Sequence, residues 1–179
     1  TTVENIEKIL NDNKNDFVAE IANDNSEGQM VLSGKTQDLE KLSSVFKENK
    51  IKNIKLPVSA PFHCSLMKKA TEIMTKELQK LNFKKGSNVL ISNITADEIF
   101  NADELKDLLT KQIENRVRWR ESVTLMINKG VNQFIEIGPG KVLSGLISRI
   151  TKNFKYRALY VTPGISSCHP EVLQSSGIG

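Results

Sequence analysis

The order of elements predicted for the first 56 residues constrains the fold more than any other feature. Thr1-x-x-Glu4 resembles a capping box, and apolar residues at helical spacing follow it. The pattern then predicts strands over 17–22 and 29–33 around a polar turn at 23–28, a helix over 37–48 and a strand over 51–56. This order is a ferredoxin-like β-α-β-β-α-β unit without its first strand. Without that first strand, the strands that would pair with it would keep unpaired backbone groups. We therefore expect the chain to begin inside a larger protein.

The rest of the chain alternates helices and strands. A proline-flanked loop over 56–63 leads into an amphipathic helix over 65–81. Further elements are predicted as a strand over 89–91, helices over 103–113 and 117–129, a buried strand over 134–137, a helix over 142–150 and a strand over 156–161. Such alternation predicts an α/β layer with parallel strand pairing. Residues 162–179 lack periodicity and are expected to be an irregular tail.

Composition excludes several classes of protein. A net charge of +4 hints at nucleic acid, but aromatic residues to stack on bases make up only 6% of the chain. Two cysteines cannot build a disulfide scaffold, which favours a reducing compartment. No apolar run is long enough for a membrane-spanning helix. We therefore expect neither a nucleic-acid nor a membrane partner.

His63 is the strongest candidate for chemistry. It directly precedes the amphipathic helix, whose positive N-terminal end favours a neutral imidazole that can accept a proton. The alternative is a surface or packed histidine without a role. Cys64 is adjacent, but neighbouring side chains point differently, so a buried structural cysteine is favoured over a nucleophile.

Other short motifs are weak. His63-Cys64 and Cys168-His169 do not have zinc-ligand spacing, so no metal site is expected. Residues 28–36 have one residue too many for a P-loop and are interpreted as a strand before a helix. Ser65-x-x-Lys68 matches a serine-enzyme motif whose companion motifs are absent, and the sequence contains no G-x-S-x-G nucleophile elbow.

The segment Gly138-Pro139-Gly140 follows a predicted strand and precedes a predicted helix. Its glycines permit a tight turn at the carboxyl end of the strand, where α/β proteins place ligands. A ligand-binding loop and a plain turn both remain open.

Three segments together resemble the malonyl-CoA:acyl carrier protein transacylase family of fatty-acid synthesis. They are the histidine loop at 56–67 (LPVSAPFHCSLM), the turn at 136–143 (EIGPGKVL) and the strand pair at 25–34 (NSEGQMVLSG). The resemblance covers roughly residues 1–161. It implies an α/β, hydrolase-like parallel-sheet subdomain with an inserted ferredoxin-like α+β subdomain. Residues 1–56 would be that small subdomain lacking its first strand, residues 57–161 the C-terminal part of the acyltransferase subdomain, and 162–179 the tail.

The resemblance also implies a ping-pong reaction in which a serine takes malonyl from coenzyme A and passes it to the phosphopantetheine thiol of acyl carrier protein. By motif, His63 would be the general base and Gln112 the residue whose backbone carbonyl orients it. Asn93 would line the site, and Asn25 is a weaker candidate for contact with the acyl group. Beyond coenzyme A thioester and phosphopantetheine, no cofactor is implied. The setting would be a bacterial cytoplasm or an organellar matrix.

The family's nucleophilic serine, oxyanion-hole glutamine and malonate-binding arginine have no counterpart in this sequence. We therefore expect a C-terminal portion of the enzyme that is inactive without the N-terminal part. The alternative is a non-catalytic module that docks acidic carrier protein through lysines such as Lys52, Lys55, Lys68 and Lys69.

Overall fold

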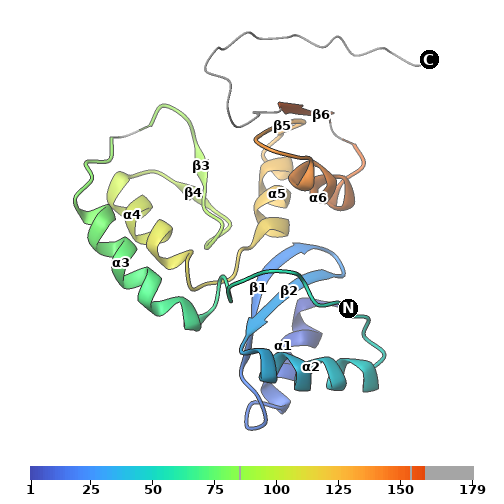
Figure 1. Ribbon diagram of the computed structural model, residues 1–179. Helices are drawn as coiled ribbons and strands as arrows, with labels where there is room; N and C mark the ends of the chain where they lie inside the picture. Colours follow the sequence, from blue (N-terminus) through green and yellow to red (C-terminus); the bar gives the residue numbers. More distant parts are fainter. Residues whose placement is uncertain (85, 154, 160–179) are drawn as a thin grey trace.

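The computed structural model describes residues 1–84, 86–153 and 155–159 (Figure 1). The first unit contains α1 (Val3–Asp12), β1 (Ala19–Ser26), β2 (Gln29–Gly34) and α2 (Thr36–Glu48). These four elements follow the predicted order. The cap of α1 was predicted one residue too early, because the Thr2 hydroxyl, not that of Thr1, accepts a 3.3 Å hydrogen bond from the Asn5 N–H.

The core of this unit lies between the two helices and the β1–β2 hairpin. Ile6 and Leu42, one from each helix, are only 1% and 2% exposed. The buried cluster comprises Val3, Ile6, Ile9, Phe17, Ile21, Leu42 and Phe46. The helical members recur at three- or four-residue spacing, which places them on one face of each helix. The unit therefore buries its apolar faces against its own elements.

The hairpin corrects the predicted turn at 23–28. Strand β1 continues to Ser26, so only Glu27 and Gly28 turn, with Gly28 at a φ of 73°. The register against β2 shifts between Ile21 and Asn23 and again between Asp24 and Ser26. Polar residues remain in the strand because its backbone is paired, on one side with β2 and on the other with Val117, whose carbonyl accepts from Asp24 at 2.9 Å.

The strand predicted over 51–56 is wrong. These residues form no helix or strand, and Ile54 and Leu56 are 76% and 41% exposed. A strand exists only where its backbone groups meet a paired neighbour. No neighbouring strand pairs with this segment among the residues that the structure describes.

The second part of the chain follows the predicted alternation. Its elements are η1 (Ser65–Met67), α3 (Lys68–Gln79), β3 (Leu90–Ile91), β4 (Glu98–Ile99), α4 (Ala102–Lys111), α5 (Trp119–Asn128), β5 (Gln133–Ile137), α6 (Val142–Ile150) and β6 (Lys155–Leu159). The parallel pairing of β5 with β6 confirms the α/β prediction. β4 was not predicted, because two residues give no detectable periodicity. Positions 160–161 of the last predicted strand and the tail 162–179 lie outside the described residues.

Strand β5 is not the buried strand that its apolar sequence predicted. Ile135 and Ile137 are 54% and 71% exposed. In Figure 1, α5, α6, β5 and β6 form one group, α3 and α4 lie side by side in another, and the hairpin unit lies below both. No helix among the described residues has the length and apolar character needed to cross a membrane.

Candidate active site

The segment 60–67 forms the tight turn that carries His63. Phe62 N–H donates to the Ala60 carbonyl at 3.0 Å, and Met67 N–H donates to the Cys64 carbonyl at 3.0 Å. The Cys64 thiol is fully buried and lies 3.1 Å from the Pro61 carbonyl, to which it donates. Burial, the largest cause, raises the pKa of this thiol, so it stays protonated and unreactive. The favoured interpretation of Cys64 as a structural residue agrees with these contacts.

His63 itself has an unusual backbone. Its φ is 58°, in the left-handed region that non-glycine residues rarely adopt. Its side chain is half-buried, and the turn directs the ring toward the end of α4. Strained backbone of this kind persists only where surrounding contacts enforce it, and it is concentrated at functional sites.

His63 and Gln112 lie together in the structure. His63 Nδ1 is 2.7 Å from the backbone carbonyl oxygen of Gln112. Gln112 follows the last residue of α4, so its carbonyl is one of those that a helix end leaves without an intrahelical partner. A carbonyl oxygen can only accept, so Nδ1 must carry the proton. A neutral His63 then has its lone pair on Nε2, where it can accept a proton.

Asn93 joins the same group, since its side-chain amide donates to Gln112 Oε1 at 3.4 Å. The Asn93 carbonyl accepts from the Arg118 N–H at 2.8 Å, which ties it to the start of α5. Asn25 behaves differently. It occupies the β1 register shift between Asp24 and Ser26, and it does not line the cavity beside His63.

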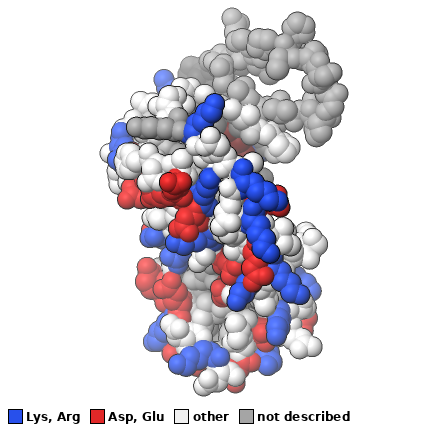
Figure 2. All heavy atoms as spheres, turned by 90° about the vertical axis from the view of Figure 1, so that its left-hand side faces the viewer, with Lys and Arg blue, Asp and Glu red and all other residues white. Residues whose placement is uncertain are grey.

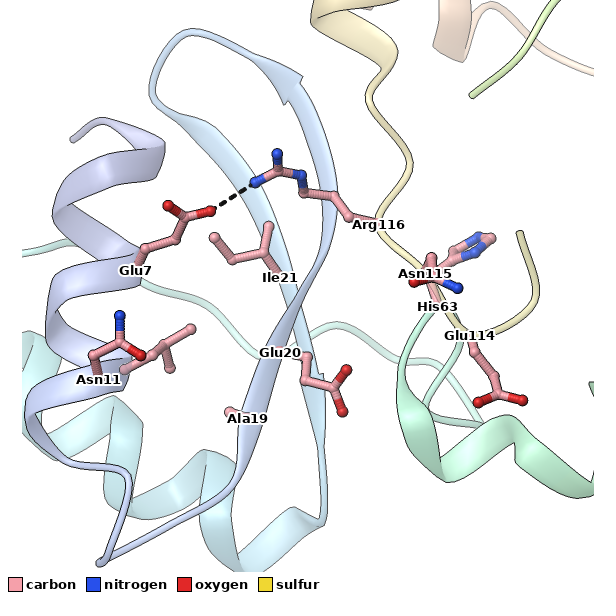
Figure 3. Close-up of a pocket in the computed structure, with 10 residues that line it drawn as sticks. Glu7, Asn11, Ala19, Glu20, Ile21, His63, Glu114, Asn115 and Arg116 are labelled. Carbon is pink, nitrogen blue, oxygen red and sulfur yellow. Dashed lines mark hydrogen bonds and ion pairs between the residues drawn. The ribbon is translucent and has the colours of Figure 1, made fainter. Parts of the chain in front are cut away.

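That cavity has a volume of about 470 Å³ and lies between α1, β1 and residues 114–116 (Figure 3). Glu7, Glu20 and Glu114 bring carboxylates to its wall, and Arg116 pairs with Glu7 at 3.0 Å. Figure 3 shows Glu20 projecting from β1 toward the side that carries His63 and Glu114. Sequence reasoning missed Glu20, Glu114 and Arg116, because only the tertiary fold brings them to the histidine.

The Gly138-Pro139-Gly140 turn has a local structural role. Glu136 at the end of β5 accepts from the N–H groups of Leu143 and Ser144 at 3.1 and 2.8 Å, and from the Ser144 hydroxyl at 2.6 Å. The Ser144 hydroxyl, and then the two N–H groups, lower the pKa of the Glu136 carboxyl. Since Glu136 occupies these donors at the start of α6, the plain-turn alternative is favoured over a ligand loop.

The weaker motifs gain no support. The Ser65 hydroxyl of the Ser65-x-x-Lys68 motif donates to the Glu20 carboxylate rather than to a lysine. No group of three or more metal-ligating side chains occurs in the part of the chain that the structure describes. Cys168 and His169 lie outside it.

Comparison with known proteins adds independent information. No protein-family model matches the chain. The "Malonyl CoA-acyl carrier protein transacylase" of Bacillus subtilis (strain 168) is 41% identical over 139 residues, which cover 77% of this chain and 44% of that protein. The protein of the same name from Escherichia coli (strain K12) is 38% identical over 138 residues, covering 76% and 45%.

Solved structures agree with these relatives. The crystal structure of malonyl CoA-acyl carrier protein transacylase from Clostridium perfringens matches with a TM-score of 0.85 and 39% identity, over 89% of this chain and 50% of that chain. A complex described as a type II PKS acyl-carrier protein with its malonyl-transacylase matches with a TM-score of 0.83 and 31% identity, over 89% and 52%. The resemblance expected from the three motifs is confirmed, as is an α/β acyltransferase fold. The chain is thus homologous to the malonyl CoA-acyl carrier protein transacylases, and it spans about half the length of the relatives it matches.

Proposed function

We propose that this chain supplies the general base of an acyltransferase that moves a malonyl group from coenzyme A to the phosphopantetheine thiol of acyl carrier protein. The observation that carries the proposal is the 2.7 Å contact between His63 Nδ1 and the Gln112 carbonyl. It leaves Nε2 as the proton acceptor of a neutral imidazole. The named function of the homologues, at 38–41% identity, supplies the substrates.

The chemistry uses Nε2 twice. First it takes the proton of a serine hydroxyl as the serine oxygen attacks the malonyl thioester carbonyl, and then the imidazolium gives that proton to the departing coenzyme A thiolate. Transfer to the carrier thiol runs the same steps in reverse. The Gln112 carbonyl holds the ring. Asn93, whose amide contacts the Gln112 side chain, would line the site, and Asn25 is the weaker candidate for acyl contact. No metal or further cofactor enters the proposed reaction.

The finer division of the fold belongs to the same proposal. Residues 1–56 are proposed to be the ferredoxin-like subdomain without its first strand, with 51–56 unpaired at its end, and the apolar cluster shared by α1, α2 and the hairpin supports this assignment. Residues 57–161 are the C-terminal part of the hydrolase-like subdomain, supported over the described residues by the parallel β5–β6 pair. Because the sequence contains no G-x-S-x-G elbow, the chain by itself is proposed to be inactive.

A hybrid enzyme tests the proposal. In it, this chain's matching residues replace those of the Bacillus subtilis transacylase, and malonyl transfer to acyl carrier protein is measured. His63→Ala is expected to lower kcat by about 10²–10⁴-fold, the usual worth of a general base. Cys64→Ala is the matched control at the adjacent position, and it is expected to retain most activity. A hybrid that is active with alanine at 63 would remove His63 from the mechanism.

Non-catalytic docking of carrier protein is the second candidate. Lys52, Lys55, Lys68 and Lys69 are all exposed, and a solved relative is described in complex with its acyl-carrier protein. However, Figure 2 shows Lys and Arg interspersed with Asp and Glu on the face that it presents. If the chain binds acyl carrier protein in a salt-dependent way while the hybrid transfers no malonyl, this candidate replaces the first.

A further inference from the structure

The residues on either side of His63 are held by two side chains of the β1–β2 hairpin. The Ser33 hydroxyl in β2 donates to the carbonyl of Phe62 at 2.6 Å. The Glu20 carboxylate in β1 accepts from the Ser65 N–H at 3.1 Å and also from the Ser65 hydroxyl. The Ser33 contact thus holds the turn at the residue before His63, and the Glu20 contacts hold it at the residue after Cys64.

The two gripping residues are partners across the hairpin. Glu20 and Ser33 stand directly opposite each other in the antiparallel register. Opposite residues project from the same face of a sheet with their Cβ atoms about 5 Å apart, which suits two side chains that hold the ends of one short turn. Their chemistry is complementary to the backbone groups they meet, since Ser33 offers a proton to a carbonyl and Glu20 offers an oxygen to an N–H.

The strained backbone between these anchors needs such a grip. His63 sits at a φ of 58°, which a free loop would leave for the extended or helical region. Ser33 is buried, so water does not compete well for its hydrogen bond to Phe62. Glu20 and Ser33 are 45 and 29 residues away in the sequence from Ser65 and Phe62, the residues they contact. The hairpin therefore holds the histidine turn through tertiary contacts.

We propose that the cross-strand pair of Glu20 and Ser33 positions His63, so that the hairpin sets the direction of the imidazole toward Gln112. Both are positioning residues, since neither contacts the imidazole through a recorded hydrogen bond. The β1–β2 hairpin then contributes to the chemistry, because Glu20 and Ser33 on one face of its sheet orient His63. We call the two contacts of Ser33 with Phe62 and of Glu20 with Ser65 the clamp. Its effect on catalysis rests on the proposed acyltransferase function, whereas its effect on the orientation of His63 can be measured without that function.

Imidazole nitrogen NMR of the 179-residue chain tests this positioning role without any assay of activity. The sequence contains two histidines, and the His63 signals are those lost in His63→Gln. In the native chain, at a pH where the imidazole is neutral, His63 is expected to show one tautomer, with a protected proton on Nδ1 and none on Nε2. Ser33→Ala and Glu20→Ala are each expected to give mixed tautomers and a rapidly exchanging Nδ1 proton. Ser33→Thr, which keeps the hydroxyl, is expected to restore the native pattern.

Ser26→Ala is the matched control. Ser26 is buried in the same hairpin, and its hydroxyl has no hydrogen-bond partner among the described residues. It is expected to leave the His63 signals unchanged, and circular dichroism confirms that each variant is folded. A folded Ser33→Ala chain with the native His63 tautomer overturns the clamp, and so does a Ser26→Ala chain that disturbs His63 equally.

The hybrid enzyme separates failure of the clamp from failure of the proposed function. With Ser33→Ala, kcat is expected to fall by about ten- to a hundredfold with KM for malonyl-CoA unchanged, because a displaced base slows chemistry rather than binding. An inactive parent hybrid whose His63 tautomer still depends on Ser33 refutes the function and supports the clamp. An active hybrid that Ser33→Ala does not slow, with its tautomer unchanged, refutes the clamp and leaves the function standing.

Discussion

The hairpin unit and the second part of the chain contain similar amphipathic helices, but the apolar faces of these helices are buried to very different extents. In α1, Val3, Ile6 and Ile9 are buried against the hairpin. In α3, no residue is buried, and Ile73 and Met74 are 65% and 44% exposed. The difference teaches that helical spacing predicts which side of a helix is apolar, whereas burial depends on what else is present to cover it.

The contrast extends to the strands. The hairpin has helices α1 and α2 packed against it, whereas Ile135 and Ile137 of β5 and Val142 at the start of α6 are largely exposed. Exposed apolar surface of this kind marks contact sites. The chain spans about half the length of its relatives. The first unit should therefore respond to mutation as a packed core does, and the exposed apolar residues of α3 in the second part should not.

The largest effect is expected at Leu42, inside the cluster of the first unit. It is 2% exposed, so Leu42→Ala removes packed methyl groups and leaves a cavity. We expect the free energy of unfolding to fall by about 2–5 kcal/mol. Urea denaturation followed by circular dichroism measures it. A loss no larger than that of a surface substitution would show that the unit is not a packed core.

The next effect is expected where the two parts meet. Arg120 of α5 donates to both carboxylate oxygens of Asp24 in β1, at 2.8–3.0 Å. Asp24 is 1% exposed, and Asp24 raises the pKa of Arg120 chiefly through the hydrogen bond. Arg120→Ala leaves a buried carboxylate without this partner, which should cost about 1–3 kcal/mol.

The matched control is Glu7→Gln, which alters the more exposed pair with Arg116. It is expected to cost less than about 1 kcal/mol. Denaturation of both variants under the same conditions gives the comparison. Equal losses would mean that the Asp24–Arg120 pair adds nothing beyond an ordinary surface pair.

A smaller, pH-dependent effect is expected at Glu136. Its pKa is lowered in the folded chain, so its contribution is present above the ordinary carboxylate range and is lost as the pH falls through the lowered value. Glu136→Gln should cost less than about 1 kcal/mol at pH 7, and the gap from the native chain should close below about pH 4. Thermal melting at several pH values measures the gap. A difference in stability between the native chain and Glu136→Gln that widens on acidification would contradict the prediction. Glu72→Gln on α3, at an exposed position, is the control for loss of one negative charge.

The smallest effect is expected on α3. Ile73→Ala removes an exposed side chain, so the free energy of unfolding should change by less than about 0.5 kcal/mol. The same denaturation measurement applies. A loss comparable to that of Leu42→Ala would erase the contrast between the two parts of the molecule.

Local sequence predicted much of the fold because many signals act over a few residues. The apolar spacing of 142–150 predicts a helix with the bounds observed for α6. Local patterns likewise predict the two strands of the hairpin and the helix α2. Predictions failed where the outcome depends on distant partners. Residues 51–56 have strand-like composition without a paired neighbour, and β1 extends through polar residues because Val117, far along the chain, pairs with it.

The candidate site divides in the same way. His63 and Cys64 carry a motif that can be recognised in the sequence, and Gln112 and Asn93 were named through the family resemblance. Glu20 and Ser33 were not, because no local pattern marks a carboxylate and a hydroxyl that act on a turn 29–45 residues away. Their role emerges only from the register of the hairpin.

Under the proposed function, this chain carries the base of the reaction but not the nucleophile. Intact-mass analysis after incubation with malonyl-CoA tests it most directly. The isolated chain should keep its mass, while the hybrid with the Bacillus subtilis transacylase should gain one malonyl group at a rate that His63→Ala greatly reduces. Malonylation of the isolated chain on any serine or cysteine would contradict the account, as would a hybrid that is acylated equally fast with His63→Ala.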